Sequence, residues 1–198
     1  MGERWLKMTP DRDTLIARRA LLAAALSSVL CLPAGAQQTE PETLSDAIRL
    51  FAHEKSAAEQ YGVILVTVGK DNVGLYVRGI RLYADAKAEF DGLISELRFD
   101  LQNGQDPAKS AKFNAALQAA AEKRVAFTSF VSDQIDKLPG ARPGLPDVIQ
   151  AVPELVTATT NAGISIWNAF HQARKESRDA ILNELDHLEW RPFSELAK

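Results

Sequence analysis

The sequence predicts an all-α protein: an up-and-down antiparallel helical bundle of about four helices behind a cleavable signal peptide. Hydrophobic residues recur at alternating steps of three and four through most of residues 43–190, which is the spacing of one helical face. Capping residues, glycines and prolines stand where these stripes begin and end. The connections are short, and amphipathic helices joined by short connections pack as antiparallel neighbours around one core.

Residues 1–36 are expected to form a signal peptide, with the bundle domain in residues 37–198. A charged opening that includes Arg18 and Arg19 precedes the apolar run 20–32, and Ala34 to Ala36 supply small residues for signal peptidase. The run is shorter than the roughly 20 residues that a spanning helix needs. We therefore expect no integral membrane anchor after processing and a periplasmic or secreted location. The paired arginines leave general secretion and twin-arginine export open.

Processing after Ala36 would remove every sulfur atom, because Met1, Met8 and Cys31 all precede the cleavage site. The mature chain could then form no disulfide, thiolate nucleophile or cysteine-bound metal site. The removed segment carries five of the 23 basic and three of the 26 acidic residues, so the remainder has an acidic excess of five. A nucleic-acid partner is not expected, since phosphate binding needs a basic surface.

The first helix is predicted to begin at Thr43, a candidate N-cap with Asp46 three residues on, and to reach about residue 60. Two β-branched runs, VILVTV and VGLYV, then flank GKDN within residues 61–77 in the manner of a β-hairpin. A lone hairpin is only marginally stable. We assign residues 61–68 to the end of the first helix, with a hairpin as the alternative.

The second helix, from about residue 72 to 102, has the most regular pattern in the chain. We expect Asp71 or Asn72 to cap its start and Asn103-Gly104 to end it. Its expected core face comprises Val73, Tyr76, Ile80, Tyr83, Lys87, Phe90, Ile94, Leu97 and Leu101.

The third helix is predicted to begin at Asp106-Pro107 and to continue to Leu138, where the loop LPGARPGLP follows. The last helical segment begins near Asp147 or at Pro153. Its stripe runs from Val156 through Phe170, Ala173 and Ile181 to Leu188, and Arg191-Pro192 stops it.

Glu184 and His187 are candidate metal ligands, because Glu-x-x-His is the spacing with which four-helix bundles hold paired metals. A second pair is lacking: Asn168 and Leu50 stand three residues before His171 and His53. We expect a solvated polar pair, no metal and no cofactor. The chain also lacks a Gly-x-Ser-x-Gly elbow and a P-loop, so we expect no catalytic residues and no enzyme activity.

The remaining charges are expected on solvated helix faces. His53 and Glu54 are adjacent in sequence and should diverge on a helix, which favours the surface for both. The basic residues are interleaved with acidic ones. Those expected to be solvated are Arg78, Arg81, Arg98, Lys123, Arg124, Arg174, Lys175 and Arg178.

Two further features are candidate binding sites. Leu75 and Leu82 lie well round from the core stripe of the second helix, so the VILVTV segment, a protein partner or a second copy should cover them. The second helix also carries aromatic residues seven apart, which Phe113, Phe127 and two later aromatics could meet across the core or around a pocket. The candidate ligand-binding residues are Tyr76, Tyr83, Phe90, Trp167 and Phe170.

These features favour a non-enzymatic exported bundle that acts by protein-protein contact in the cell envelope through the surface around Leu75 and Leu82. The partner would be another protein or a second copy, as a homo-oligomer. The alternative is a carrier of a small apolar ligand in an aromatic-lined core cavity. A metal-binding bundle is a third and weaker interpretation.

Overall fold

The computed structural model describes residues 43–69, 72–137 and 152–198, and every regular element in these ranges is a helix. The prediction of an all-α bundle is confirmed. The signal-peptide prediction for residues 1–36, the candidate cap Asp71 and the loop 138–146 lie outside the described residues. The elements are α2 (Leu44–Gly69), α3 (Val73–Asn103), the 3₁₀ turn η1 (Pro107–Lys109), α4 (Ala111–Asp136), α5 (Val152–Gln172), α6 (Lys175–Asp186) and α7 (Phe193–Leu196).

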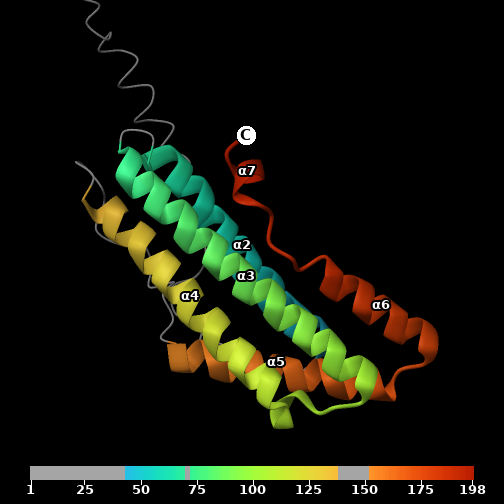
Figure 1. The fold of residues 1–198 in the computed structure, drawn as a ribbon. Helices are drawn as coiled ribbons and strands as arrows, with labels where there is room; N and C mark the ends of the chain where they lie inside the picture. The colour runs from blue at the N-terminus through green and yellow to red at the C-terminus, as the bar shows by residue number, and fades with distance from the viewer. Residues whose placement is uncertain (1–42, 70–71, 138–151) are drawn as a thin grey trace, which may run out of the picture. The chain divides into compact units, whose positions relative to one another are not determined.

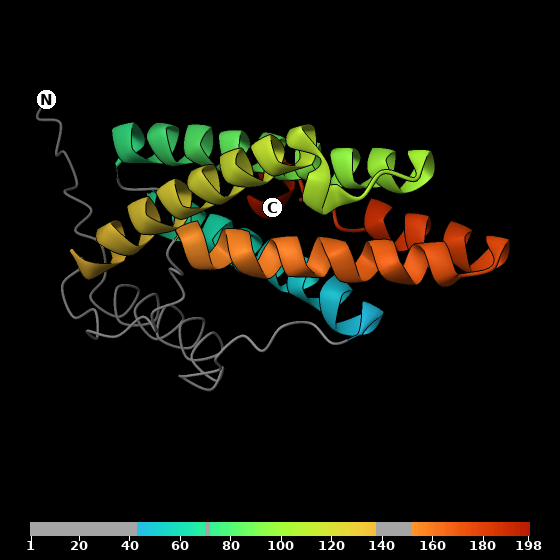
Figure 2. The same ribbon diagram turned by 90° about the horizontal axis from the view of Figure 1, so that it is seen from below.

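The four long helices close into a bundle in which α2 packs on α3, α3 on α4, α4 on α5, and α5 again on α2. Successive long helices run in opposite directions (Figure 1). Seen from below, α3 and α4 occupy one half of the bundle and α5 and α2 the other (Figure 2). The two short helices α6 and α7 are additions to this four-helix plan, and α6 packs against both α3 and α5.

Residues 61–69 and 73–77 are helical, which decides between the two interpretations of this stretch in favour of helix. Thr43 caps α2 as predicted: its Oγ1 accepts a hydrogen bond from the amide of Asp46 at 3.2 Å. Farther along, Leu65 lies so close to α3 that a Cβ at Gly79 would stand 2.4 Å from its Cδ2. The second half of α2 therefore covers the first half of α3, and the missing side chain at Gly79 permits the close approach.

Helix α3 begins and ends as predicted. The Asn72 side chain accepts a hydrogen bond from the Leu75 amide at 3.1 Å. At the other end Gly104 has φ 66° and ψ 29°, the left-handed conformation that glycine adopts without a steric penalty. Its amide and that of Gln105 bond the carbonyls of Leu101 and Asp100 at 3.3 and 2.8 Å.

The start of the third helix differs from the prediction. Asp106 does act as a cap, accepting from the Ala108 amide at 3.0 Å, but it caps only the short turn η1. Ser110 then caps α4, with its Oγ 3.3 Å from the Phe113 amide. Asp106 and Ser110 both have the short side-chain acceptor of an N-cap residue, so the sequence alone does not show which of them begins the long helix.

The prediction of one unbroken last helical segment is wrong, because the chain leaves the helix at Ala173 and Arg174. Neither a proline nor a glycine marks this break. Its carbonyls are bonded by Arg178, whose Nε donates to Phe170 O at 2.9 Å and whose Nη2 donates to His171 O at 3.1 Å. The Arg178 side chain of α6 thus donates to carbonyls that would have accepted backbone amides in a continued helix. The helix α7 beyond Pro192 was not predicted either.

Candidate functional site

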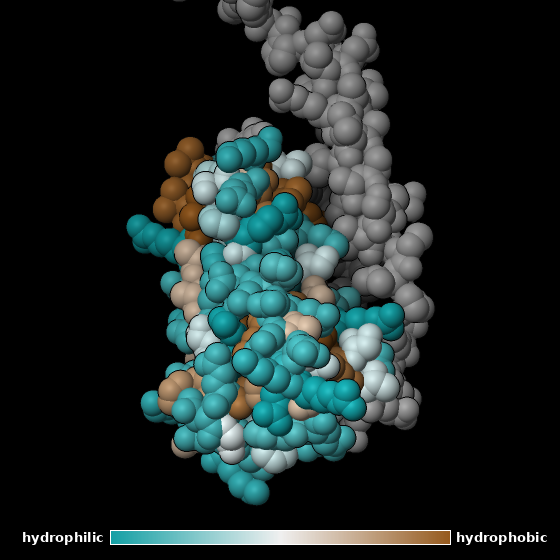
Figure 3. All heavy atoms as spheres, turned by 90° about the vertical axis from the view of Figure 1, so that its right-hand side faces the viewer, coloured by the Kyte–Doolittle hydropathy of each residue, from teal (hydrophilic) through white to brown (hydrophobic). Residues whose placement is uncertain are grey.

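Leu75 and Leu82 are only half-buried, and both pack against the hydrophobic core. The exposed large hydrophobic residues of the described ranges all belong to α2 and α3. Val63 is 46% exposed, Val73 74% and Val77 41%, and Phe99 near the other end of α3 is 47% exposed. Hydrophobic surface is visible at the upper end of the bundle, where α2 ends and α3 begins (Figure 3). The candidate contact surface is therefore better represented by these valines than by the two leucines.

The aromatic stripe of α3 is packed against other aromatic rings. Tyr83 is fully buried, and its ring centroid lies 5.4 Å from that of Phe127, a pairing that the sequence predicted. Its other close neighbours come from the C-terminal part of the chain: Trp190 at 5.7 Å and Phe193 at 5.5 Å. Phe90 likewise lies 5.2 Å from Trp190. Of these partners, Trp190 and Phe193 were not predicted to meet the stripe.

Trp167 and Phe170 form a separate group. Their rings lie 4.6 and 5.7 Å from the His171 ring, and the Arg178 guanidinium stands 5.3 Å from the Phe170 centroid. No close ring pair joins either residue to the α3 stripe among the described residues. The five residues of the candidate ligand site are thus divided between two groups.

Residues 187–196, which we call the aromatic segment, run from the end of α6 along α2 and α3 to α7. Its hydrophobic side chains are buried: Trp190 is 2% exposed, and Leu188 and Leu196 also belong to the core. Leu196 lies so close to α2 that a Cβ at Gly62 would be 2.6 Å from its Cδ1. The bundle core therefore extends beyond the four long helices to include this segment.

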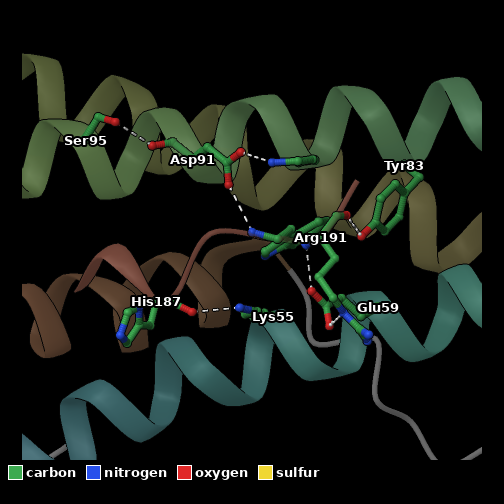
Figure 4. A network of polar contacts seen from close by, with 9 residues as sticks. Lys55, Glu59, Tyr83, Asp91, Ser95, His187 and Arg191 are labelled. Atoms are coloured by element: carbon green, nitrogen blue, oxygen red, sulfur yellow. Dashed lines mark hydrogen bonds and ion pairs between the residues drawn. The ribbon is translucent and has the colours of Figure 1, made fainter. Parts of the chain in front are cut away.

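A carboxylate on α2 is the central polar anchor of the aromatic segment. Glu59 is buried, and it accepts the backbone amide of Arg191 at 2.8 Å and the Nε of the same residue at 2.9 Å (Figure 4). Two donors from one residue fix both the position and the direction of the chain at this point. A carboxylate that accepts charge-assisted bonds in this way forms some of the stronger hydrogen bonds in proteins.

Helix α3 completes the attachment from the other side. Tyr83 donates its hydroxyl to Arg191 O at 2.7 Å, and Asp91 Oδ1 accepts the Trp190 amide at 3.2 Å (Figure 4). The second carboxylate oxygen of Asp91 pairs with Lys87. Burial raises the pKa of Tyr83, and the nearby Glu59 carboxylate raises it further. The tyrosine is therefore held as a neutral donor.

The prediction that Glu54 and Arg124 are solvated is wrong, because both residues are buried. Glu54 is 5% and Arg124 3% exposed, and Oε2 of the first lies 3.0 Å from Nε of the second, so the two form an interior ion pair between α2 and α4. His53 Nδ1 lies 3.9 Å from Glu54 Oε1, although the two residues are adjacent in sequence. The carboxylate raises the pKa of His53, while burial opposes this effect.

Glu184 and His187 are both exposed, and His187 is the C-cap of α6. The backbone carbonyl of His187 accepts Lys55 Nζ at 2.7 Å, which adds a further bond to the aromatic segment. In the described ranges no three His, Cys, Asp or Glu side chains are grouped to hold a metal ion. A shallow groove of about 290 Å³ lies beside Glu184, lined also by Leu44, Ser45, Ile48, Arg49 and Ala52. None of the five candidate aromatic residues lines this groove.

Sequence reasoning did not identify Glu59, Asp91, Trp190 or Arg191 as parts of one site. Arg191 and Pro192 had served only as a helix stop. The single available signal was the pair of aromatic residues, Trp190 and Phe193, on either side of that stop. No local pattern connects them to Glu59, because the Glu59–Arg191 contact joins residues 132 positions apart.

None of the helices in the described residues has the length and hydrophobicity needed to cross a bilayer. No protein-family model, curated protein or solved structure matches the chain. A function must therefore be argued from the contacts above, since a helical bundle by itself implies none.

Proposed function

We propose that this chain is an exported, non-enzymatic protein of the cell envelope that acts by binding another protein through the exposed valines of the α2–α3 hairpin. The observation that carries the proposal is the exposure of Val63, Val73 and Val77 in the half of the hairpin where α2 ends and α3 begins. Single exposed hydrophobic residues are ordinary, but a group of them on adjoining helices is characteristic of contact surfaces.

The position of these residues on their helices supports the proposal. Val73 and Val77 are four residues apart and so share one face of α3. Leu75 and Tyr76 beside them are half-buried and pack on the core. A partner could thus cover the valines while the hairpin beneath keeps its packing. The proposed contact surface therefore includes Leu75 at its edge but does not include Leu82.

Site-specific photo-crosslinking in producing cells tests the contact. A photoreactive residue at Val73 should give an adduct with a second protein, whereas the same residue at the exposed Ala88 of α3 should not. Val77→Asp should abolish the adduct and leave the circular dichroism spectrum unchanged, because Val77 lies outside the buried core. Equal labelling at both positions would refute the proposal. An adduct of two identical chains would assign the surface to a homo-oligomer.

Export is tested separately. If residues 1–36 are removed on secretion, the protein recovered from the periplasm or medium begins at Gln37 when its intact mass is measured. Protein that retains this segment would refute the processing proposal without affecting the contact surface. Replacing Arg18 and Arg19 by lysine should block export only if the twin-arginine route is used.

A further inference from the structure

We draw no further inference here: the strongest candidate, the outward face of α3 between the exposed Val77 and Phe99, is an unpartnered helix face, and nothing in the described part of the chain shows what covers it.

Discussion

Tyr83→Phe is the most direct test of how the aromatic segment is attached, because it removes one hydroxyl and leaves the ring. The hydroxyl donates to Arg191 O at 2.7 Å, and the ring keeps its contacts with Phe127, Trp190 and Phe193. A net hydrogen bond contributes about 1 kcal/mol, and a buried carbonyl left without a donor adds about 1–3 kcal/mol. Arg191 is partly exposed, so water can replace part of the loss. We expect the free energy of unfolding to fall by about 1.5 kcal/mol.

Urea unfolding followed by far-ultraviolet circular dichroism measures this change. With an m-value of about 2 kcal/mol/M, the midpoint should fall by about 0.7 M while m stays constant. Tyr76→Phe is the matched control, because its hydroxyl bonds no other described residue and its ring also meets Phe193. The control should change the free energy of unfolding by less than about 0.5 kcal/mol. Equal shifts in the two variants would refute the reasoning.

The same variant should alter the response to alkaline pH. Burial raises the pKa of Tyr83 above its ordinary value of 10, so the folded chain holds this proton more tightly than the unfolded chain. The contribution is fully present below the unfolded pKa and is lost as pH rises towards the folded pKa. Above about pH 10 the unaltered chain should therefore lose stability more steeply than Tyr83→Phe. Parallel pH profiles would contradict the role of burial.

Three other predictions concern the rest of the bundle. Arg124→Met should destabilise the chain by about 3–5 kcal/mol because it leaves the Glu54 carboxylate buried without its cation, and Glu54→Gln added to it should recover part of the loss in urea unfolding. His53→Gln should remove a stabilisation present below about pH 6.5 and lost as pH rises through the raised pKa, so the melting temperatures of the two chains should converge from pH 5.5 to pH 8. Gly104→Ala should destabilise by about 1–2 kcal/mol because of the left-handed backbone, whereas Gly92→Ala in open space on α3 should stabilise by up to about 1 kcal/mol, both measured by thermal unfolding.

Each of these three has its own contrary outcome. A double variant as unstable as Arg124→Met alone would mean that the ion pair is not the source of the loss. A constant difference in melting temperature between pH 5.5 and pH 8 would exclude a contribution from His53 protonation. Equal effects of the two glycine substitutions would mean that the conformation of Gly104 carries no strain for alanine.

Local patterns were sufficient to predict most of the helices. Thr43, Asn72 and Gly104 bond amides or carbonyls only a few residues away, so their roles could be predicted from sequence. The break at Ala173 could not, because a side chain on the next helix satisfies the exposed carbonyls. The hydrophobic stripe resumes at Ile181 after the polar residues 174–179, and this interruption alone does not distinguish a break from a solvated turn of one continuous helix.

The sites were less predictable than the helices. Periodicity correctly paired Tyr83 with Phe127, but it also suggested Trp167 and Phe170 as partners of the α3 stripe. The rings that meet Tyr83 from the C-terminal side lie beyond the last predicted helix, at Trp190 and Phe193. Which aromatic residues meet depends on the path of the chain after α6, and no short-range signal records that path.

Sequence alone determined that the described part of the chain is helical, where α3 begins and ends, and that the long helices alternate in direction, because caps, breakers and the 3.6-residue period act within a few residues. Tertiary structure alone decided that Glu59 holds Arg191 and that Glu54 meets Arg124 inside the bundle. A charged residue on a helix has the same local pattern whether it faces water or a partner helix. Its environment is set by the rotation and register of helices that are distant in sequence, and those are fixed only when the whole core packs.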